Sequence, residues 1–342
     1  MVTDKVEVFK ISAFFAFKES SFGVKELRNY MKYSGIGGQA VMEGVMMKNK
    51  DAYAVAVRTP ERNIVVDTGE YPGIVKNKKL RKLPFVRGVI SFVESLALGM
   101  KTLTFSASFF EEEEAESGQK PRDAKREKRE ENMMMGGSIA IALLLAVGIF
   151  MVLPYYLSLI FKQYIQSAWL LALIEGLIRM VLFLAYVAGI SLVPDIKRVY
   201  MYHGAEHKCI NCIEHGMDLT VDNVRKSSRL HKRCGTSFLF LVVFISVIFF
   251  MFIQTDVRFL RLLLRILLIP VIAGISYEFI RLAGRSDHWL VNLFSKPGLC
   301  IQKITTREPS DDMIEVGIAA VEAVFDWKTY VKEMRQEQRM GR

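Results

Sequence analysis

The stretch GGSIAIALLLAVGIFMVLPYYLSLIF, residues 136–161, contains no charged side chain. Three further apolar segments follow it, at 169–193, 236–253 and 258–280. A helix needs roughly 20 predominantly apolar residues to cross the hydrocarbon of a bilayer, so all four segments are long enough. Hydrophobic residues make up 51% of the chain, which agrees. The sequence therefore predicts a membrane α-helical protein with four transmembrane helices in a domain spanning residues 133–290.

The formal net charge of +10 is distributed unevenly between the loops. The connections at 162–168 and 254–257 hold one basic residue and none. The loop at 194–235 holds eight: Lys197, Arg198, Lys208, Arg225, Lys226, Arg229, Lys232 and Arg233. Because Lys and Arg are enriched in cytoplasmic loops, we expect this loop and both termini to be cytoplasmic. The start of the chain shows no signal peptide, which fits this orientation.

The expected partner of this basic chain is the lipid bilayer. Excess positive charge in a membrane protein faces anionic lipid. A nucleic-acid-binding protein would carry a basic groove with stacking aromatic residues, and the sequence has no such pattern. We therefore expect no nucleic-acid partner.

Residues 1–110 are predicted to form a small cytoplasmic α+β domain. Residues 52–58 and 63–69 alternate in polarity around the turn signal TPER, which predicts a β-hairpin. Residues 85–110 read as a helix with a narrow polar stripe. This membrane-proximal amphipathic helix could pack on the small domain or lie in the membrane surface. Residues 111–132 are a charge run and are expected to form a solvated linker.

Residues 291–342 are expected to form a cytoplasmic C-terminal segment. Within it, 295–309 (SKPGLCIQKITTREP) reads as a loop with short extended pieces. Residues 311–336 read as one amphipathic helix, and we expect it to pack against the N-terminal hairpin domain.

Charges also occur inside two predicted spans. Glu175 and Arg179 are four residues apart and can pair along one helix face. Arg265 lies deep in the fourth span, where an unpaired charge costs at least ~2.5–3.5 kcal/mol, and Glu175 is its expected partner. These residues could be a packing pair or a polar path for a substrate or ion.

The loop at 194–235 concentrates metal-ligand residues. His203, Glu206 and His207 spell H-x-x-E-H, which on a helix places both imidazoles on one face. Two imidazoles so placed can bind zinc, and Glu206 would be close enough to act as a general base. Inverted zinc peptidases carry the same string. His231 and Cys234 follow downstream and complete a predicted ligand set of His203, His207, His231 and Cys234.

A second arrangement competes with this one. Cys209, Cys212, His231 and Cys234 have the spacing of a zinc ribbon, which would be a closed, structural site. Isolated histidines and cysteines can also simply pack or form hydrogen bonds. A disulfide framework is not expected, because the cysteines cluster with histidines, as in metal sites of reducing compartments.

The chain also resembles a known family through motifs in a fixed order: GGQAVMEGVMM (37–47), YHGAEHK (202–208), HKRCGTSF (231–238), SYE (276–278) and TTREP (305–309). These resemble the YqhQ-like family of bacterial membrane proteins, which have unknown function and are described as predicted metal-dependent enzymes.

The resemblance implies a multi-pass protein of the bacterial inner membrane. It covers the predicted histidine ligands and Cys234 but not Cys209 and Cys212, which favours the first ligand set. Glu214 or Glu278 could replace Cys234 as a ligand.

The resulting expectation is a metal-dependent hydrolase with Zn²⁺, or alternatively Fe²⁺, at the cytoplasmic face. Its general base would be Glu206, and its substrate a lipid-linked molecule or a membrane protein. The alternative is a non-enzymatic membrane scaffold or transporter with a structural metal site.

Overall fold

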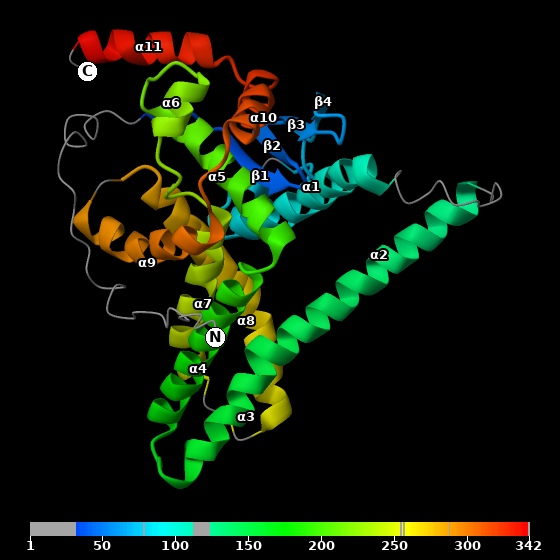
Figure 1. Cartoon of the computed structure of the whole chain (residues 1–342). Helices are drawn as coiled ribbons and strands as arrows, with labels where there is room; N and C mark the ends of the chain where they lie inside the picture. The colour runs from blue at the N-terminus through cyan, green and yellow to red at the C-terminus, as the bar shows by residue number, and fades with distance from the viewer. Residues whose placement is uncertain are drawn as a thin grey trace, which may run out of the picture.

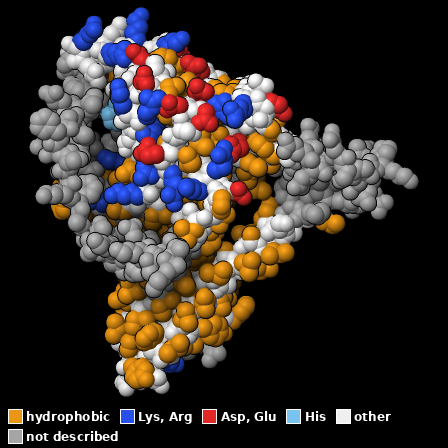
Figure 2. Space-filling view, in the orientation of Figure 1, with side chains coloured by type: hydrophobic (Ala, Val, Ile, Leu, Met, Phe, Trp, Pro, Cys, Tyr) orange, Lys and Arg blue, Asp and Glu red, His pale blue; other side chains and the backbone are white. Residues whose placement is uncertain are grey.

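The computed structural model describes residues 32–77, 79–111, 124–253, 255, 257–286 and 288–340. Long helices form a bundle at one end, and a small β-sheet with its covering helices lies at the other end (Figure 1). Hydrophobic side chains cover the bundle, whereas charged side chains gather on the other part (Figure 2). Parts of the predicted α+β domain (1–31) and of the predicted linker (112–123) lie outside the described residues.

The sheet is an antiparallel meander with strand order β1-β2-β3-β4. Its strands are β1 (Gly37–Val41), β2 (Gly44–Asn49), β3 (Ala52–Arg58) and β4 (Ile64–Glu70). The pairing of β3 with β4 confirms the predicted hairpin, with Arg58 opposite Ile64. The β1–β2 hairpin was not predicted, because Gly, which supplies three of its eleven strand residues, is depleted in strands.

The helices follow the strands. They are α1 (Val86–Glu111), α2 (Ala124–Val147), α3 (Leu153–Leu159), α4 (Ala168–Ile190), α5 (Pro194–Glu214), α6 (Val221–Lys226), α7 (Gly235–Met251), α8 (Arg258–Ala283), α9 (Trp289–Thr305), α10 (Asp311–Glu322) and α11 (Trp327–Arg339). A π-helical turn, Gly148–Val152, joins α2 to α3. Short 3-10 turns lie at Leu80–Lys82 and Ile160–Gln163.

Both faces of the sheet are covered by helices. Val45 projects from one face into a core shared with Tyr202 of α5 and Ile314 of α10. Val55 projects from the opposite face and packs near Leu98 of α1. Because successive strand residues point to opposite faces, burial on both sides explains why β2 and β3 are almost continuously apolar. The sheet therefore holds α5 on one side and α1 on the other.

The described part of the chain has four helical segments long and apolar enough to cross a membrane: Val86–Phe110, Gly136–Gln163, Ala168–Ile190 and Phe259–Ala283. Three of them confirm predicted spans. The span predicted at 236–253 is instead α7, which has 17 residues and packs between α4, α8 and α9. At 17 residues α7 is shorter than the four candidate spans, and Val86–Phe110, predicted as a membrane-proximal helix, is long and apolar enough to be one of the four.

The second half of the predicted linker is not a solvated coil. Helix α2 starts at Ala124 and continues without a break into the first candidate span. Lys, Arg and Glu, which fill residues 125–131, are strong helix formers, so this charged stretch extends the helix.

Helix α1 contacts both parts of the molecule. Gly88 lies so close to α8 that an added Cβ would be 2.7 Å from the Cβ of Tyr277. Farther along, Leu98 is buried against the sheet. One stripe of α1 is apolar and exposed: Val93, Leu96, Met100 and Leu103. The helix therefore packs on the small domain and presents an apolar stripe outward, which suits a membrane surface.

The loop predicted at 295–309 is wrong for most of its length, because residues 295–305 belong to helix α9. Pro297 and Gly298 have low helix propensity, but tertiary packing outweighs it: an added Cβ on Gly298 would lie 2.9 Å from the Cβ of Ser237 on α7. Helix α9 runs across the bundle (Figure 1). Its other side exposes Trp289, Leu290, Leu293 and Phe294.

The single helix predicted at 311–336 is two helices, because Asp326 caps a new start by accepting from the Thr329 N–H at 3.1 Å.

The charges inside the bundle form one buried group. Glu175 accepts from the Arg265 guanidinium through both carboxylate oxygens, at 2.5 and 2.8 Å, and from Arg179 at 2.9 Å. Arg179 also donates to the carbonyl oxygen of Phe150 at 2.8 Å. Both predicted pairings are confirmed. These bonds join α4 to α8 and to the chain before α3.

Candidate metal centre

Helix α5 carries the H-x-x-E-H residues, and local sequence fixes its start and path. Pro194 lies in the first turn, where its missing N–H costs no hydrogen bond. Gly204 faces the segment after α9: an added Cβ would come within 2.0 Å of the Arg307 carbonyl oxygen. The Arg307 N–H donates to the carbonyl oxygen of Tyr200 at 2.8 Å. Glycine at 204 therefore allows this segment to cross α5.

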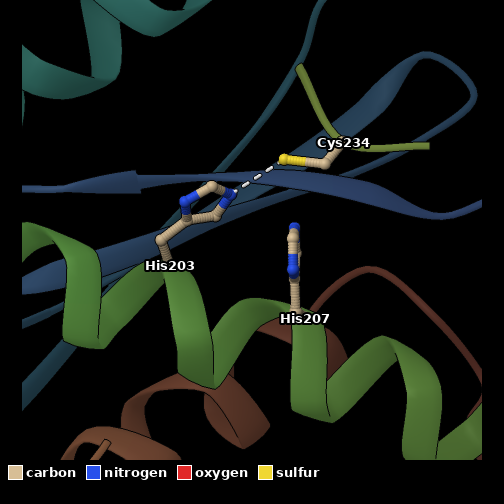
Figure 3. A group of neighbouring side chains, drawn as sticks. All are labelled: His203, His207 and Cys234. Carbon is tan, nitrogen blue, oxygen red and sulfur yellow. Dashed lines mark hydrogen bonds between the residues drawn. The ribbon is translucent and has the colours of Figure 1, made fainter. Parts of the chain in front are cut away.

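Three donor atoms converge beside this crossing. His203 and His207 project from successive turns of α5 towards Cys234, which precedes α7 (Figure 3). One donor atom from each residue lies within 4.8 Å of the other two. The Cys234 Sγ is 3.2 Å from His203 Nε2. The structure thus brings together three of the four predicted ligands.

Backbone carbonyls orient both imidazoles. His203 Nδ1 is 2.9 Å from the carbonyl oxygen of Thr305, and His207 Nδ1 is 2.6 Å from that of Arg229. A carbonyl can only accept a hydrogen bond, so each Nδ1 carries the proton and donates it. Each Nε2 is then the ring nitrogen left to bind a metal ion. Such outer hydrogen bonds fix the tautomer and orientation of metal-binding histidines in proteins.

We expect alanine at position 204 to destabilise this crossing. The Cβ would strike backbone, which cannot rotate away, and overpacking of this kind costs about 1–3 kcal/mol in the free energy of unfolding. Thermal unfolding of the detergent-purified protein measures the effect. Gly189→Ala is the matched control, since no heavy atom lies within 4 Å of an added Cβ there. Equal melting temperatures for the two variants would contradict the assigned role of Gly204.

Glu206 stands beside the donors and is almost fully buried. Its Oε2 is 3.8 Å from His203 Nε2 and 3.6 Å from His207 Nε2. Gly38 of β1 makes room for this side chain, because an added Cβ there would lie 2.8 Å from Glu206 Cγ. The carboxylate is thus held between strand β1 and the two imidazoles.

The Cys234 thiol and the two imidazoles shift one another's pKa values. Burial alone would raise the pKa of Cys234, but the neighbouring His203 and His207 bring that pKa well below its usual value. Burial alone would lower the pKa of His203, but the Cys234 thiolate raises it to about 9. Cys234 also caps the N-terminus of α7, where a thiolate is favoured. The site therefore favours the thiolate, the form of cysteine that binds metals.

His231, the fourth predicted ligand, has a different partner. Its ring centroid is 5.7 Å from that of His207, but its Nε2 lies 3.3 Å from Glu214. Arg233 donates to the other oxygen of Glu214 at 2.5 Å. Burial would raise the pKa of Glu214, yet the His231 hydrogen bond and the Arg233 charge lower it to about 2. Gln302 bonds both backbone polar groups of His231. The structure places His231 beside the donors but orients it towards Glu214.

The competing ribbon residues are not brought together in the described part of the chain. Cys209 belongs to the core between α5 and α10, where an added Cβ on Gly317 would lie 2.9 Å from its Sγ. Cys212 is directed to the carbonyl oxygen of Asp218, 3.4 Å away. Burial raises the pKa of both thiols. These cysteines pack as small apolar side chains.

Glu278, which was considered as an alternative ligand, is engaged elsewhere, and so is the nearby Glu308. Glu278 pairs with Arg87 of α1, whose Nε lies 2.6 Å from its Oε1. Glu308, in the TTREP segment, pairs with Lys208 at 2.9 Å. These contacts tie α8 to α1 and the TTREP segment to α5.

A cavity of about 270 Å³ opens onto the three donors. Its lining comes from α5, α8, the start of α7 and the chain before β1. The lining residues are Tyr33, Gly35, Ile36, Gly37, Gly38, His203, Glu206, His207, Ile210, His231, Arg233, Cys234, Gly235, Tyr277, Ile280, Arg281 and Arg285. A small molecule or part of a larger one can therefore reach the donor atoms and Glu206.

Comparison with known proteins identifies the family. Residues 83–327 match a family described as protein of unknown function (DUF1385). The chain belongs to this family. The DUF1385 region contains α5, Cys234 and the TTREP crossing. The chain is also 36% identical over 290 residues to "Uncharacterized protein YqhQ" of Bacillus subtilis (strain 168), which covers 82% of this chain and 89% of the relative. No solved structure matches.

These comparisons confirm the resemblance to YqhQ but assign no reaction. The metal-dependent activity that the resemblance implied stays a prediction. Sequence reasoning missed the carbonyl oxygens of Thr305 and Arg229, because a backbone acceptor has no side-chain signature. It also missed Arg281 and Arg285, whose spacing of four on the last turn of α8 and just beyond it resembles an ordinary basic end of a membrane helix.

Proposed function

We propose that this DUF1385 protein is a multi-pass membrane protein with a catalytic divalent-metal centre, and that it hydrolyses a membrane-associated substrate. One arrangement carries the proposal: the donor atoms of His203, His207 and Cys234 face one another beside Glu206, at the wall of a cavity. Catalytic zinc sites commonly use three protein ligands and keep one position open, whereas structural sites use four.

The donor set fits zinc. With Zn–N bonds of about 2.0–2.1 Å and Zn–S bonds of about 2.3 Å, ligand atoms around a tetrahedral ion are roughly 3.3–3.6 Å apart. The separation of 3.2 Å between Cys234 Sγ and His203 Nε2 is close to that value. Two imidazoles with a thiolate also suit Fe²⁺, but sulfur ligation favours zinc.

The surrounding residues supply the rest of the chemistry. A bound divalent ion would act as a Lewis acid and lower the pKa of a water molecule. Glu206 would accept the proton of the attacking water and return it to the leaving group. The Thr305 and Arg229 carbonyls would hold His203 and His207 in the ligating orientation. The buried wall formed by β1 and α5 would limit access of bulk water.

We place the centre at the cytoplasmic side of the bacterial inner membrane, with both termini cytoplasmic. The basic loop between α4 and α7 supports this orientation under the positive-inside rule. The alternative, a scaffold or transporter, has less support. Glu175, the acidic residue available for a polar path through the described helices, is engaged by two arginines.

The test is an open coordination position. Full-length protein purified in detergent and loaded with Co²⁺ should show a thiolate-to-cobalt charge-transfer band and tetrahedral d–d bands. Azide should shift the d–d bands. Cys234→Ser should remove the charge-transfer band, and Cys209→Ala should keep it. A cobalt spectrum that azide leaves unchanged would indicate a closed structural site and defeat the catalytic proposal.

Glu206→Gln should separate metal binding from catalysis. The amide has the same shape but cannot accept a proton, so we expect metal content and the cobalt spectrum to be retained. Hydrolysis of the chromogenic probe bis(4-nitrophenyl) phosphate, or of 4-nitrophenyl acetate, should fall by about 10²–10⁴-fold. Glu322→Gln, at the C-terminal end of α10 and outside the cavity lining, is the control. If Glu206→Gln hydrolyses whichever probe the wild type accepts at the wild-type rate, Glu206 is not the base.

A further inference from the structure

Three arginines line the same cavity as the metal donors: Arg233, Arg281 and Arg285. Glu206 is the single carboxylate among the lining residues that the structure describes. Arg233 is paired with Glu214. Within the described chain, neither Arg281 nor Arg285 has a carboxylate within ion-pair distance. Among the described residues, the cavity therefore gathers more positive charge than direct ion pairs neutralise.

An aromatic ring holds two of these arginines close together. The Arg233 Cζ is 4.0 Å from the centroid of the Tyr33 ring, and the Arg285 Cζ is 5.5 Å from it. The negative face of an aromatic ring attracts guanidinium groups, but it does not cancel their repulsion. Two cations held around one ring beside a third are an arrangement that an anion would stabilise.

The start of α7 adds backbone donors to the same wall. Gly235 lines the cavity, and no heavy atom lies within 4 Å of the position of an added Cβ. Helix N-termini carry partial positive charge and N–H groups without a partner in the helix. The Thr236 N–H is bonded to Cys234 Sγ, and the missing side chain leaves the backbone at Gly235 accessible. A ligand at the metal donors would thus meet backbone N–H groups on one side and guanidinium groups on the other.

The chemistry of these groups selects among anions. Guanidinium forks match the paired oxygens of a phosphate or carboxylate. Several arginines, a divalent ion and a helix N-terminus together suit a group with more than two oxygens and more than one negative charge. A phosphate fulfils both conditions, because it can contact the metal and two arginines at the same time.

The position of the cavity indicates how such a ligand arrives. Tyr277, Ile280 and Arg281 belong to the last turns of α8, at the end of the candidate span Phe259–Ala283. The exposed apolar stripe of α9 starts a few residues later, at Trp289. If the bundle is in a bilayer, the cavity lies at the depth of the lipid headgroups.

We propose that the cavity binds a phosphate ester, with its phosphate held by Arg281, Arg285 and the start of α7 beside the metal centre. The substrate class is thus a phosphate ester, either a lipid headgroup or a soluble molecule. This inference rests on the proposed metal centre but adds to it the identity of the group that is bound.

Paramagnetic cobalt tests the proximity directly. Full-length protein in phosphatidylcholine nanodiscs, loaded with Co²⁺, is titrated with inorganic phosphate while the ³¹P linewidth is recorded. In a second arm the nanodiscs contain phosphatidic acid. Broadening beyond that of the Zn²⁺-loaded protein places the phosphorus next to the metal. Broadening of inorganic phosphate alone supports a soluble ester, and broadening of phosphatidic acid supports a lipid. No broadening in either arm overturns the proposal.

Variants separate this proposal from the metal centre itself. Arg281→Gln and Arg285→Gln should retain the cobalt spectrum but weaken phosphate binding at least about tenfold each, because each removes a charge-assisted hydrogen bond. Arg339→Gln, at the end of α11, removes the same charge outside the cavity lining and should bind like the wild type. An absent cobalt spectrum would defeat the proposed function. A normal cobalt spectrum with unchanged phosphate affinity in both arginine variants would defeat this inference alone.

Discussion

Replacing His203 by alanine is expected to remove the metal from the purified protein. Wild-type protein should carry about one divalent ion per chain by elemental analysis. Loss of a direct ligand should weaken binding by more than about 100-fold, since loss of an outer hydrogen-bond partner alone costs 10–100-fold. His203 contributes one of the three donor atoms, and its removal leaves two protein ligands, too few to hold the ion tightly.

Cys209→Ala is the matched comparison for that experiment. Cys209 is on the same helix and is fully buried, but its Sγ packs against α10. We expect this variant to keep its metal. If metal is lost from Cys209→Ala and retained in His203→Ala, the ion is held by a ribbon-type site, and the assignment of His203, His207 and Cys234 is wrong.

Glu175→Gln should be the most destabilising substitution in the helical bundle. Glu175 neutralises one of two buried arginines, so its removal leaves Arg179 and Arg265 facing each other without a counter-charge. Breaking a buried ion pair in this way costs about 3–5 kcal/mol in the free energy of unfolding. Unfolding of the detergent-purified protein by added SDS, followed by circular dichroism, measures the loss.

Arg265→Gln is the control for this experiment. Arg265→Gln leaves Glu175 paired with Arg179, a neutral pair, so its cost should be clearly smaller than that of Glu175→Gln. Both variants remove one charge, and Arg265→Gln also shortens the side chain, so a smaller cost for Arg265→Gln can only come from the charge balance. Equal destabilisation would show that hydrogen-bond count, and not net charge, governs the stability of this group.

The sequence was most informative where a short-range pattern carries the geometry. The β-branched segments at 52–58 and 63–69, with the turn signal TPER between them, were sufficient for the β3–β4 hairpin. The i, i+4 spacing was sufficient to place His203 and His207 on one face of α5. Three candidate spans followed from uncharged length. In these cases the structure depends on residues that are close together in the sequence.

Long-range packing explains what could not be predicted. His231 has the spacing of a ligand, but Glu214 engages it from the end of α5, a contact that no local pattern reveals. Helix α9 contains Pro297 and Gly298 and forms because the glycine permits a close approach to α7. Helix α7 is apolar enough for a span, yet it is short and surrounded by other helices. Each outcome depends on a distant neighbour.

The crossing of α5 by the chain after α9 links the orientation of His203 to the position of α9. The carbonyl that orients His203 belongs to Thr305, the terminal residue of α9. A tilt of α9 would move that oxygen and rotate the imidazole with it. The exposed side of α9 is apolar, so a bilayer or micelle around it would act on its tilt. In the proposed metal centre, bilayer thickness and detergent chain length would then change the metal affinity.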